Sequence, residues 1–175
     1  MSFYFKQVPI TNYDDIIAEV RRHILSRDWD GKIGFYEIAG GALLDQCPKL
    51  REWFGCNQMV LRATGIIITG PQIANNIHID YMAPQWSQLA LNMNILNCEV
   101  PKTKLFNTSA LPTVDSAQSG ALYYRYPTTA VFDQIAEFDL ALPVLFNTQV
   151  PHQVCNMTDE KRMSISFRFY QDPAI

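Results

Sequence analysis

The amino-terminal part of the chain carries a helical pattern of apolar and polar positions. Over residues 11–25 the apolar side chains recur at helical spacing and form one stripe, made up of Tyr13, Ile16, Ile17, Val20 and Ile24. Thr11 or Asn12 can cap the start of this helix. Asp14 and Asp15 suit the positive end of its dipole. The pattern predicts an amphipathic helix with one buried face.

Two further segments complete this part of the chain. Residues 2–8 are predicted to form a strand, and residues 42–54 a second helix. Pro48 favours a break or a restart inside that helix, and Gly55 can end it. We expect these helices to pack against the outside of a sheet.

From about residue 58 onward the pattern changes to short segments rich in β-branched and aromatic residues, separated by Pro, Gly, Asn and Ser. The predicted strands are residues 59–69, 76–82, 88–98, 104–109, 121–126, 143–149, 152–156 and 162–170. Eight short strands after a helical cap fit a jelly roll, so we expect a mainly β protein with supporting α-helices. Residues 128–142 fit either a helix or a pair of strands.

Strand alternation places the polar residues of three predicted strands on one face of each strand. These faces carry His78 and Asp80, then Asn92 and Asn94, and finally Arg162, Ser164, Ser166 and Arg168. The three polar faces can line one cavity. The alternative is that they face water, as the outer face of an antiparallel sheet commonly does.

Length and composition limit the classes of protein to consider. The chain has 175 residues, of which 48% are apolar and 18% charged, and its net charge is −3. A chain of this length can bury about two-thirds of its unfolded surface as one domain. We expect a single domain over residues 1–175, with residues 1–57 as helical and strand support and residues 58–175 as the jelly-roll core. The acidic balance argues against a nucleic-acid partner.

Cysteine usage and the amino terminus indicate the compartment. Cys47, Cys56, Cys98 and Cys155 show no C-x-x-C spacing, and the amino terminus lacks the pattern of a signal peptide. No run approaches the ~18 consecutive apolar residues of a membrane helix. We expect reduced thiols, a cytoplasmic location and no membrane partner.

Candidate chemistry centres on two histidines and one aspartate. His78, Asp80 and His152 form the ligand set that holds non-haem Fe(II) on one side and leaves the other positions open. A His-x-Asp pair alone is a weak signal, because it arises often by chance. His152 strengthens it because it begins a predicted strand directly after Pro151, and Arg162 follows ten residues later. These positions favour a metal site beside an anion-binding pair.

Three short motifs then resemble a known superfamily. HID (78–80), PHQVCN (151–156) and RMS (162–164) are similar to the signature elements of the 2-oxoglutarate/Fe(II)-dependent oxygenases, over roughly residues 75–170. The stretch NTQVPHQVCN (147–156) is similar to the aspartyl/asparaginyl and prolyl hydroxylase branches. The resemblance implies a double-stranded β-helix, the cupin-like form of the jelly roll.

By this resemblance His78, Asp80 and His152 are the catalytic residues and hold Fe(II). Arg162 and Ser164 would bind the distal carboxylate of 2-oxoglutarate, which a planar guanidinium meets with two hydrogen bonds. With O2, such an enzyme converts 2-oxoglutarate to succinate and CO2 and usually hydroxylates a C–H bond. The substrate expected is peptidyl or a small molecule.

Two other classes of function stay open at this point. A cupin-like metal protein or a non-catalytic binding protein can use the same scaffold without 2-oxoglutarate, and a structural jelly roll needs no metal at all. Arg162 with Ser164 discriminates between these classes, because the alternatives have no need of a carboxylate clamp. The oligomeric state is open as well.

Other polar and aromatic residues have weaker assignments. Asn92 or Asn94 can orient the other end of the cosubstrate, or can simply be a satisfied polar residue of a sheet. Arg168 is interpreted as a charge at the solvent end or the substrate rim. Five aromatic residues can line a substrate mouth, although packing is the more common role, namely Tyr81, Trp86, Tyr123, Tyr124 and Tyr126. Specificity is expected in the loops 82–88, 107–120 and 126–140.

Overall fold

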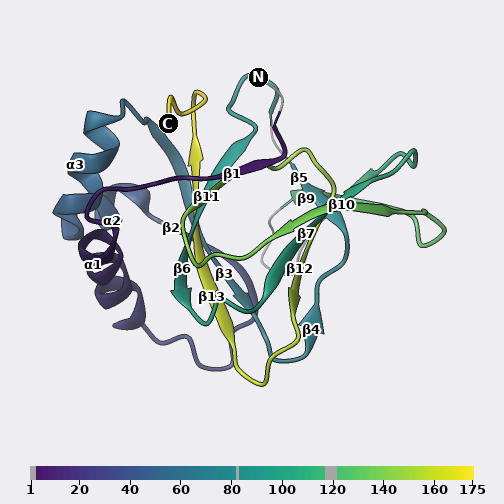
Figure 1. Ribbon diagram of the computed structural model, residues 1–175, viewed down its shortest axis with the longest axis horizontal. Coiled ribbons are helices and arrows are strands. Elements are labelled where there is room, and N and C mark those ends of the chain that lie inside the picture. Colours follow the sequence, from purple (N-terminus) through teal and green to yellow (C-terminus); the bar gives the residue numbers. More distant parts are fainter. Residues whose placement is uncertain (1–2, 82, 117–121) are drawn as a thin grey trace.

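Two antiparallel sheets face each other in the computed structural model, which describes residues 3–81, 83–116 and 122–175 (Figure 1). The first sheet has the strand order β1-β11-β6-β13-β3-β2. Its strands are β1 (Phe5–Gln7), β2 (Gly34–Ile38), β3 (Leu61–Thr69), β6 (Leu89–Leu96), β11 (Val144–Asn147) and β13 (Arg162–Phe169).

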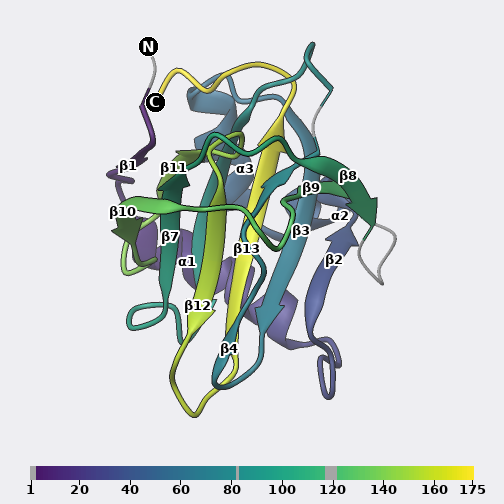
Figure 2. The same cartoon turned by 90° about the vertical axis from the view of Figure 1, so that its right-hand side faces the viewer.

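The second sheet has the order β10-β7-β12-β5-β9-β8, with β4 paired to β12. Figure 2 looks onto this sheet and shows β7 and β12 side by side. Its strands are β4 (Ile73–Ala74), β5 (His78–Asp80), β7 (Lys102–Asn107), β8 (Thr113–Ser116), β9 (Leu122–Arg125), β10 (Asp133–Phe138) and β12 (His152–Asn156).

The chain passes repeatedly between the sheets, as a jelly roll does. Strands β3, β6, β11 and β13 lie together in the first sheet, and β5, β7, β10 and β12 lie in the second. The predicted fold class, mainly β with supporting helices, is confirmed. The predicted strand within residues 121–126 forms β9, which pairs with β5 and β8 at one end of the second sheet. Residues 128–142 contain β10, which pairs with β7 and is the edge strand at the other end.

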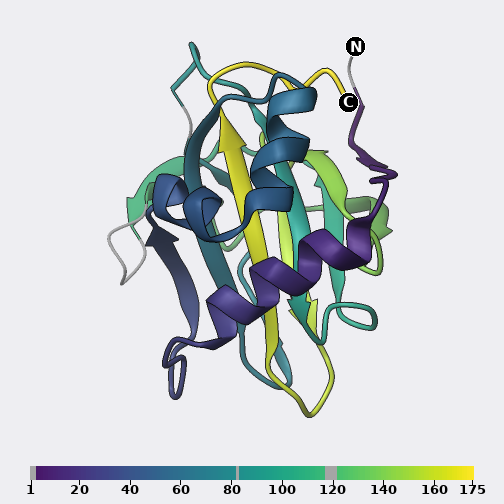
Figure 3. The same cartoon turned by 90° about the vertical axis from the view of Figure 1, so that its left-hand side faces the viewer.

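Three helices cover the outer face of the first sheet. They are α1 (Tyr13–Leu25), α2 (Gly40–Gln46) and α3 (Pro48–Cys56), and Figure 3 shows them in front of β13. Four residues of the predicted apolar stripe of α1 are buried and the fifth, Tyr13, is partly buried against them. The stripe lies in one core with residues of β13, namely Met163, Ile165, Phe167 and Phe169. None of the helices in the described residues is long and apolar enough to cross a membrane.

Only some of the predictions for the helix ends are confirmed. The break at Pro48 is confirmed, because Cys47 separates α2 from α3. Asn12 occupies the N-cap position of α1 in a left-handed conformation, but its side chain makes no capping hydrogen bond. Gly55 does not end α3, which continues to Cys56. Strand β2 had no predicted counterpart.

Pairing of β13 with both neighbours fixes the direction of its polar face. Ser164 lies opposite Asn94 of β6, and Ser166 lies opposite Asn92. These four side chains are buried. The alternative that the polar faces meet water is therefore wrong, because the second sheet covers this side of the first.

The helical layer should contribute strongly to stability. Phe54 of α3 packs edge-to-face on Phe167 and Phe169, with ring centroids 5.1 and 5.9 Å away. We expect Phe54→Ala to lower the free energy of unfolding by about 3–5 kcal/mol, since it removes a buried ring. Urea denaturation measures this loss. Leu111→Ala is the control at an 84% exposed position and should change stability by less than about 0.5 kcal/mol. If the two substitutions lower the free energy of unfolding equally, the packing of α3 on β13 through Phe54 is contradicted.

Candidate metal centre

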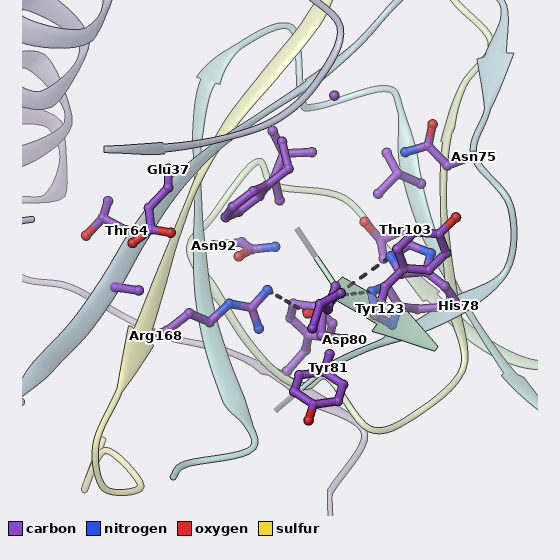
Figure 4. A pocket seen from close by; sticks show the side chains of 18 of the residues that line it. Glu37, Thr64, Asn75, His78, Asp80, Tyr81, Asn92, Thr103, Tyr123 and Arg168 are labelled. Atoms are coloured by element: carbon purple, nitrogen blue, oxygen red, sulfur yellow. Dashed lines mark hydrogen bonds and ion pairs between the residues drawn. The ribbon is translucent and has the colours of Figure 1, made fainter. Parts of the chain in front are cut away.

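Two neighbouring strands of the second sheet bring His78, Asp80 and His152 together. The first two lie two residues apart on β5, and His152 pairs directly with His78 across the β5–β12 ladder. The Oδ1 atom of Asp80 lies 3.7 Å from the Nε2 atom of His78 and 3.8 Å from that of His152. One candidate ligand atom from each residue lies within 4.8 Å of the other two. The three side chains converge as in a metal centre, and Figure 4 shows two of them, His78 and Asp80.

Backbone carbonyls hold both imidazoles in the orientation that a metal requires. Nδ1 of His78 lies 2.8 Å from the carbonyl oxygen of Asn76, and Nδ1 of His152 lies 2.9 Å from that of Val150. A carbonyl only accepts, so each Nδ1 carries the proton and donates it. Both Nε2 lone pairs therefore face the carboxylate of Asp80, free for a cation.

Arg168, which lies on the first sheet, pairs with the carboxylate of Asp80 on the second sheet and controls its protonation. Its Nη2 atom donates to Oδ2 of Asp80 at 2.6 Å. Burial by itself raises the pKa of Asp80, but the charge of Arg168 and then of the two histidines lowers it to about 2. Asp80 is therefore ionised at neutral pH. Of the two alternatives for Arg168, a charge at the solvent end is wrong, because the second sheet covers β13 and this side chain is only 10% exposed. A charge at the substrate rim has structural support, because Arg168 lines the cavity beside these residues.

His152 is kept neutral. Burial, and then the neighbouring His78, lower its pKa to about 4, although Asp80 acts in the opposite direction. An imidazole with a pKa well below 7 has its Nε2 lone pair available at neutral pH. Such an arrangement can bind a divalent metal without first losing a proton.

A cavity of about 830 Å³ opens beside the three residues. Among its lining residues are three of the aromatic candidates: Tyr81, Trp86 and Tyr123. The other two pack against rings instead, Tyr124 on Tyr81 and Tyr126 on Phe132. The substrate-mouth interpretation therefore has structural support for three aromatic residues. Within the expected specificity loops, Met82 and residues 117–120 lie outside the described residues.

Residues of β2 and β3 that sequence reasoning missed form another wall of the cavity. Phe35 and Glu37 come from β2, and the ring of Phe35 lies so close over Gly65 that a Cβ there would come within 2.1 Å of it. A bulge in β3 inserts Arg62 opposite the end of β13. The guanidinium of Arg62 lies over the ring of Trp86, 4.4 Å from its centroid. The Gly-bounded run GFYEI was the available signal for β2.

The predicted carboxylate clamp lies deeper between the sheets. Arg162 is 1% exposed, and its Nη1 atom lies 3.4 Å from Oγ of Ser164. Neither residue lines the cavity. Within the described residues no carboxylate lies within 4 Å of Arg162, and its Nε atom has no hydrogen-bond partner. Asn92 lines the cavity, whereas Asn94 donates to Glu99 instead.

Known proteins provide a comparison at the level of the fold. No family model matches this chain, and no curated protein sequence matches it significantly. A prolyl-4-hydroxylase of Pseudomonas putida is similar in structure, with 14% identity over 97% of this chain and 93% of that chain, and a TM-score of 0.52. The epimerase SnoN, solved with Fe3+, α-ketoglutarate and nogalamycin RO, has 16% identity over 94% and 78% of the two chains and a TM-score of 0.57.

This chain has the double-stranded β-helix fold. The resemblance to the 2-oxoglutarate/Fe(II)-dependent superfamily is thereby confirmed for the fold. A second structure of SnoN, described as a non-haem α-ketoglutarate-dependent epimerase, has the same fold similarity, with a TM-score of 0.53. At these identities the similarity extends to the fold, while the roles of individual residues in this double-stranded β-helix depend on their own geometry.

The three converging residues predict a metal-binding test. We expect His152→Ala to weaken binding of Mn(II), a redox-stable probe, by about a hundredfold or more, because two ligands replace three. Calorimetric titration of the metal-free protein measures affinity and stoichiometry. His23→Ala is the matched control, since His23 lies on α1, outside the cavity. Unchanged affinity in His152→Ala, in a variant with a wild-type melting curve, would exclude His152 as a ligand.

Proposed function

We propose that this protein is an Fe(II)- and 2-oxoglutarate-dependent oxygenase. It hydroxylates a C–H bond of a small-molecule or peptidyl substrate and forms succinate and CO2. One observation carries the proposal: the barrel that brings His78, Asp80 and His152 together also encloses Arg162 without a carboxylate partner among the described residues. A metal site alone fits many cupin-like proteins, but a buried cation needs an anion.

The donor set fits a divalent iron. Two neutral imidazoles and one carboxylate offer nitrogen and oxygen donors from one side, and their Nε2 and Oδ1 atoms already face one another. His78, Asp80 and His152 would hold the ion. Bound Fe(II) supplies the redox chemistry that couples decarboxylation of 2-oxoglutarate to oxidation of a C–H bond. The fold shared with SnoN supports this assignment.

Arg162 fits the distal carboxylate of the cosubstrate. Removing a guanidinium from water without an ion-pair partner is costly, so its burial between two sheets supports the proposal that it binds an anion. A carboxylate can accept two parallel hydrogen bonds from its planar fork. Ser164 lies within reach of the same nitrogen and can donate a further bond. Together these groups would orient the cosubstrate along the polar face of β13.

The cavity supports a substrate of moderate size. Its volume falls within the range of small-molecule sites, with room for more than a five-carbon acid. The aromatic side chains that line it, Tyr81, Trp86 and Tyr123, would provide apolar contact to the substrate. Arg62 and Glu37 add one charge of each sign to the wall. Such a wall suits a substrate that carries polar groups beside an apolar body.

Spectroscopy tests the proposed function directly. After anaerobic loading with Fe(II), addition of 2-oxoglutarate should produce a visible metal-to-ligand charge-transfer band, and Arg162→Ala should weaken cosubstrate binding by about tenfold to a hundredfold, as expected for a lost charge-assisted pair. Arg51→Ala on α3 is the control, since this exposed arginine lies outside the cavity. Bound metal without a band would favour a cupin-like metal protein, and no bound metal would favour a structural jelly roll.

The buried cation also predicts a conflict between stability and binding. Arg162→Met replaces an incompletely partnered guanidinium by an apolar chain, so we expect the free energy of unfolding without cosubstrate to rise by about 1–3 kcal/mol. Urea denaturation with and without saturating metal and 2-oxoglutarate separates the two effects. Wild type should be stabilised by the ligands and the variant much less. If the variant is less stable than wild type both with and without the ligands, Arg162 is not a destabilising unpaired charge and this interpretation is wrong.

A further inference from the structure

Arg62 places a cation on the first-sheet side of the cavity. The β-bulge at the end of the β3–β13 pairing sets its side chain into the cavity wall. Its guanidinium lies over the ring of Trp86, 4.4 Å from the ring centroid. A guanidinium stacked on a ring keeps its donors in its own plane, where they can meet an anionic group edge-on. Arg62 and Trp86 together therefore form a platform suited to an anion.

Hydrogen bonds hold the loop that carries Trp86. The amide of Trp86 donates to the carbonyl oxygen of Ala83 at 3.0 Å, and the carbonyl oxygen of Trp86 accepts from Nε2 of Gln88 at 2.8 Å. The next residue, Ser87, donates to Oδ1 of Asp172 at 2.6 Å. Because the backbone around the ring is fixed in this way, binding a ligand on the platform requires little further ordering of the protein.

An apolar surface follows along β3 because Gly65 has no side chain. Two ring carbons of Phe35, Cε2 and Cζ, lie where the Cβ of a larger residue at position 65 would be. Phe35 lies opposite Ile67 in the β2–β3 pairing, and both line the cavity together with Val154 of β12. Rings pack favourably on other rings, so Phe35 and Trp86 favour a ligand with an aromatic body.

Glu37 adds a negative charge to the same wall. It follows Phe35 by two residues on β2 and lines the cavity, and Figure 4 shows it on the opposite side of the cavity from His78. Burial and the nearby Arg168 lower the pKa of Arg62, whereas Glu37 raises it, so the three charges lie within electrostatic reach of one another. A carboxylate near Arg62 repels a ligand that brings a second negative charge.

We propose that this wall binds the primary substrate and that the substrate is a monoanionic aromatic molecule, such as an aromatic carboxylate. Arg62, stacked on Trp86, binds the anionic group, and Phe35 packs against the aromatic body. Glu37 selects against a second negative charge. This assignment rests on the proposed function and deepens it by naming the class of substrate. The wall belongs to the first sheet and the three candidate metal ligands to the second, so the substrate lies across the cavity from the metal centre.

Naphthalene derivatives that share one ring system and differ in charge test this assignment. The probes are 2-naphthoate, 2-naphthalenemethanol, 2-naphthalenemethylamine and 2-naphthyl phosphate. We would measure their dissociation constants by anaerobic calorimetry on protein saturated with Fe(II) and 2-oxoglutarate, so that the cosubstrate occupies its own site. Wild type should bind 2-naphthoate about tenfold to a hundredfold more tightly than the neutral alcohol, and Arg62→Met should abolish this difference. Arg62→Lys should retain only part of it, because an ammonium cannot form the bidentate pair.

Glu37→Gln gives a prediction of the opposite sign. Loss of the negative charge should strengthen binding of 2-naphthoate about twofold to fivefold and binding of the doubly charged phosphate by a larger factor, without an effect on the alcohol. If wild type instead binds the amine most tightly and Glu37→Gln weakens it, the wall binds a cation and the assignment is wrong. Arg51→Met and Glu52→Gln, both at exposed positions on α3, are the matched controls.

The seat of Phe35 is tested separately. Gly65→Ala should push the ring into the cavity and weaken 2-naphthoate about tenfold, while the smaller benzoate is weakened less. Gly41→Ala on α2 is the matched control, since a Cβ there meets no atom within 4 Å outside its own helix. Phe35→Ala removes the ring contact without overpacking and should also weaken 2-naphthoate, which keeps the test decisive if Gly65→Ala does not fold. Unchanged affinity in Phe35→Ala, in a variant with a wild-type melting curve, rules out Phe35 as part of the site.

The outcomes separate this subsite from the function on which it rests. If wild type binds 2-oxoglutarate but shows no preference for 2-naphthoate over the alcohol, the substrate site is overturned and the oxygenase proposal stands. If wild type with metal alone binds 2-naphthoate through Arg62 but does not bind 2-oxoglutarate, the oxygenase proposal falls and the anion site stands. If Arg62→Met binds 2-naphthoate as tightly as wild type, the anionic group lies elsewhere and the assignment of Arg62 is wrong.

Discussion

The alternation of side chains along β13 is the constraint on which the rest of the structure depends. One face of this strand, with Met163 and Phe167, packs beneath the helices, and the other presents Ser164 and Arg168 to the space between the sheets. Because β13 lies between β3 and β6, all eight of its residues are buried. The helical layer covers the first face, and the candidate site occupies the second.

An ion pair joins the two sheets at this site. Asp80 belongs to the second sheet and Arg168 to the first, so their 2.6 Å contact spans the interior beside both histidines. The pair keeps Asp80 ionised and fixes which oxygen faces the metal centre. Farther inside, Arg162 has no such partner among the described residues. The charge of Arg168 is therefore balanced by Asp80, whereas that of Arg162 is not, and this buried cation is the physical basis for the proposed carboxylate ligand.

The wall opposite the histidines comes from a part of the chain that serves two purposes. Strand β2 extends the first sheet beyond β3 and also supplies Phe35 and Glu37 to the cavity. The bulge at the end of the β3–β13 pairing adds Arg62. One wall of the cavity and an edge of the first sheet thus come from the same segment, so a change in its packing alters the cavity as well.

The sequence by itself determined the helical stripe, the jelly-roll strands and the nearness of His78 to Asp80, because these follow from local periodicity. It did not determine the role of Arg168, the strand β2 or the register that places His152 opposite His78. Those features depend on contacts between residues distant in the chain, and periodicity shows which residues share a face but not what lies opposite that face. Only the packing of the two sheets decided that the polar face of β13 is buried and that its last arginine meets a carboxylate.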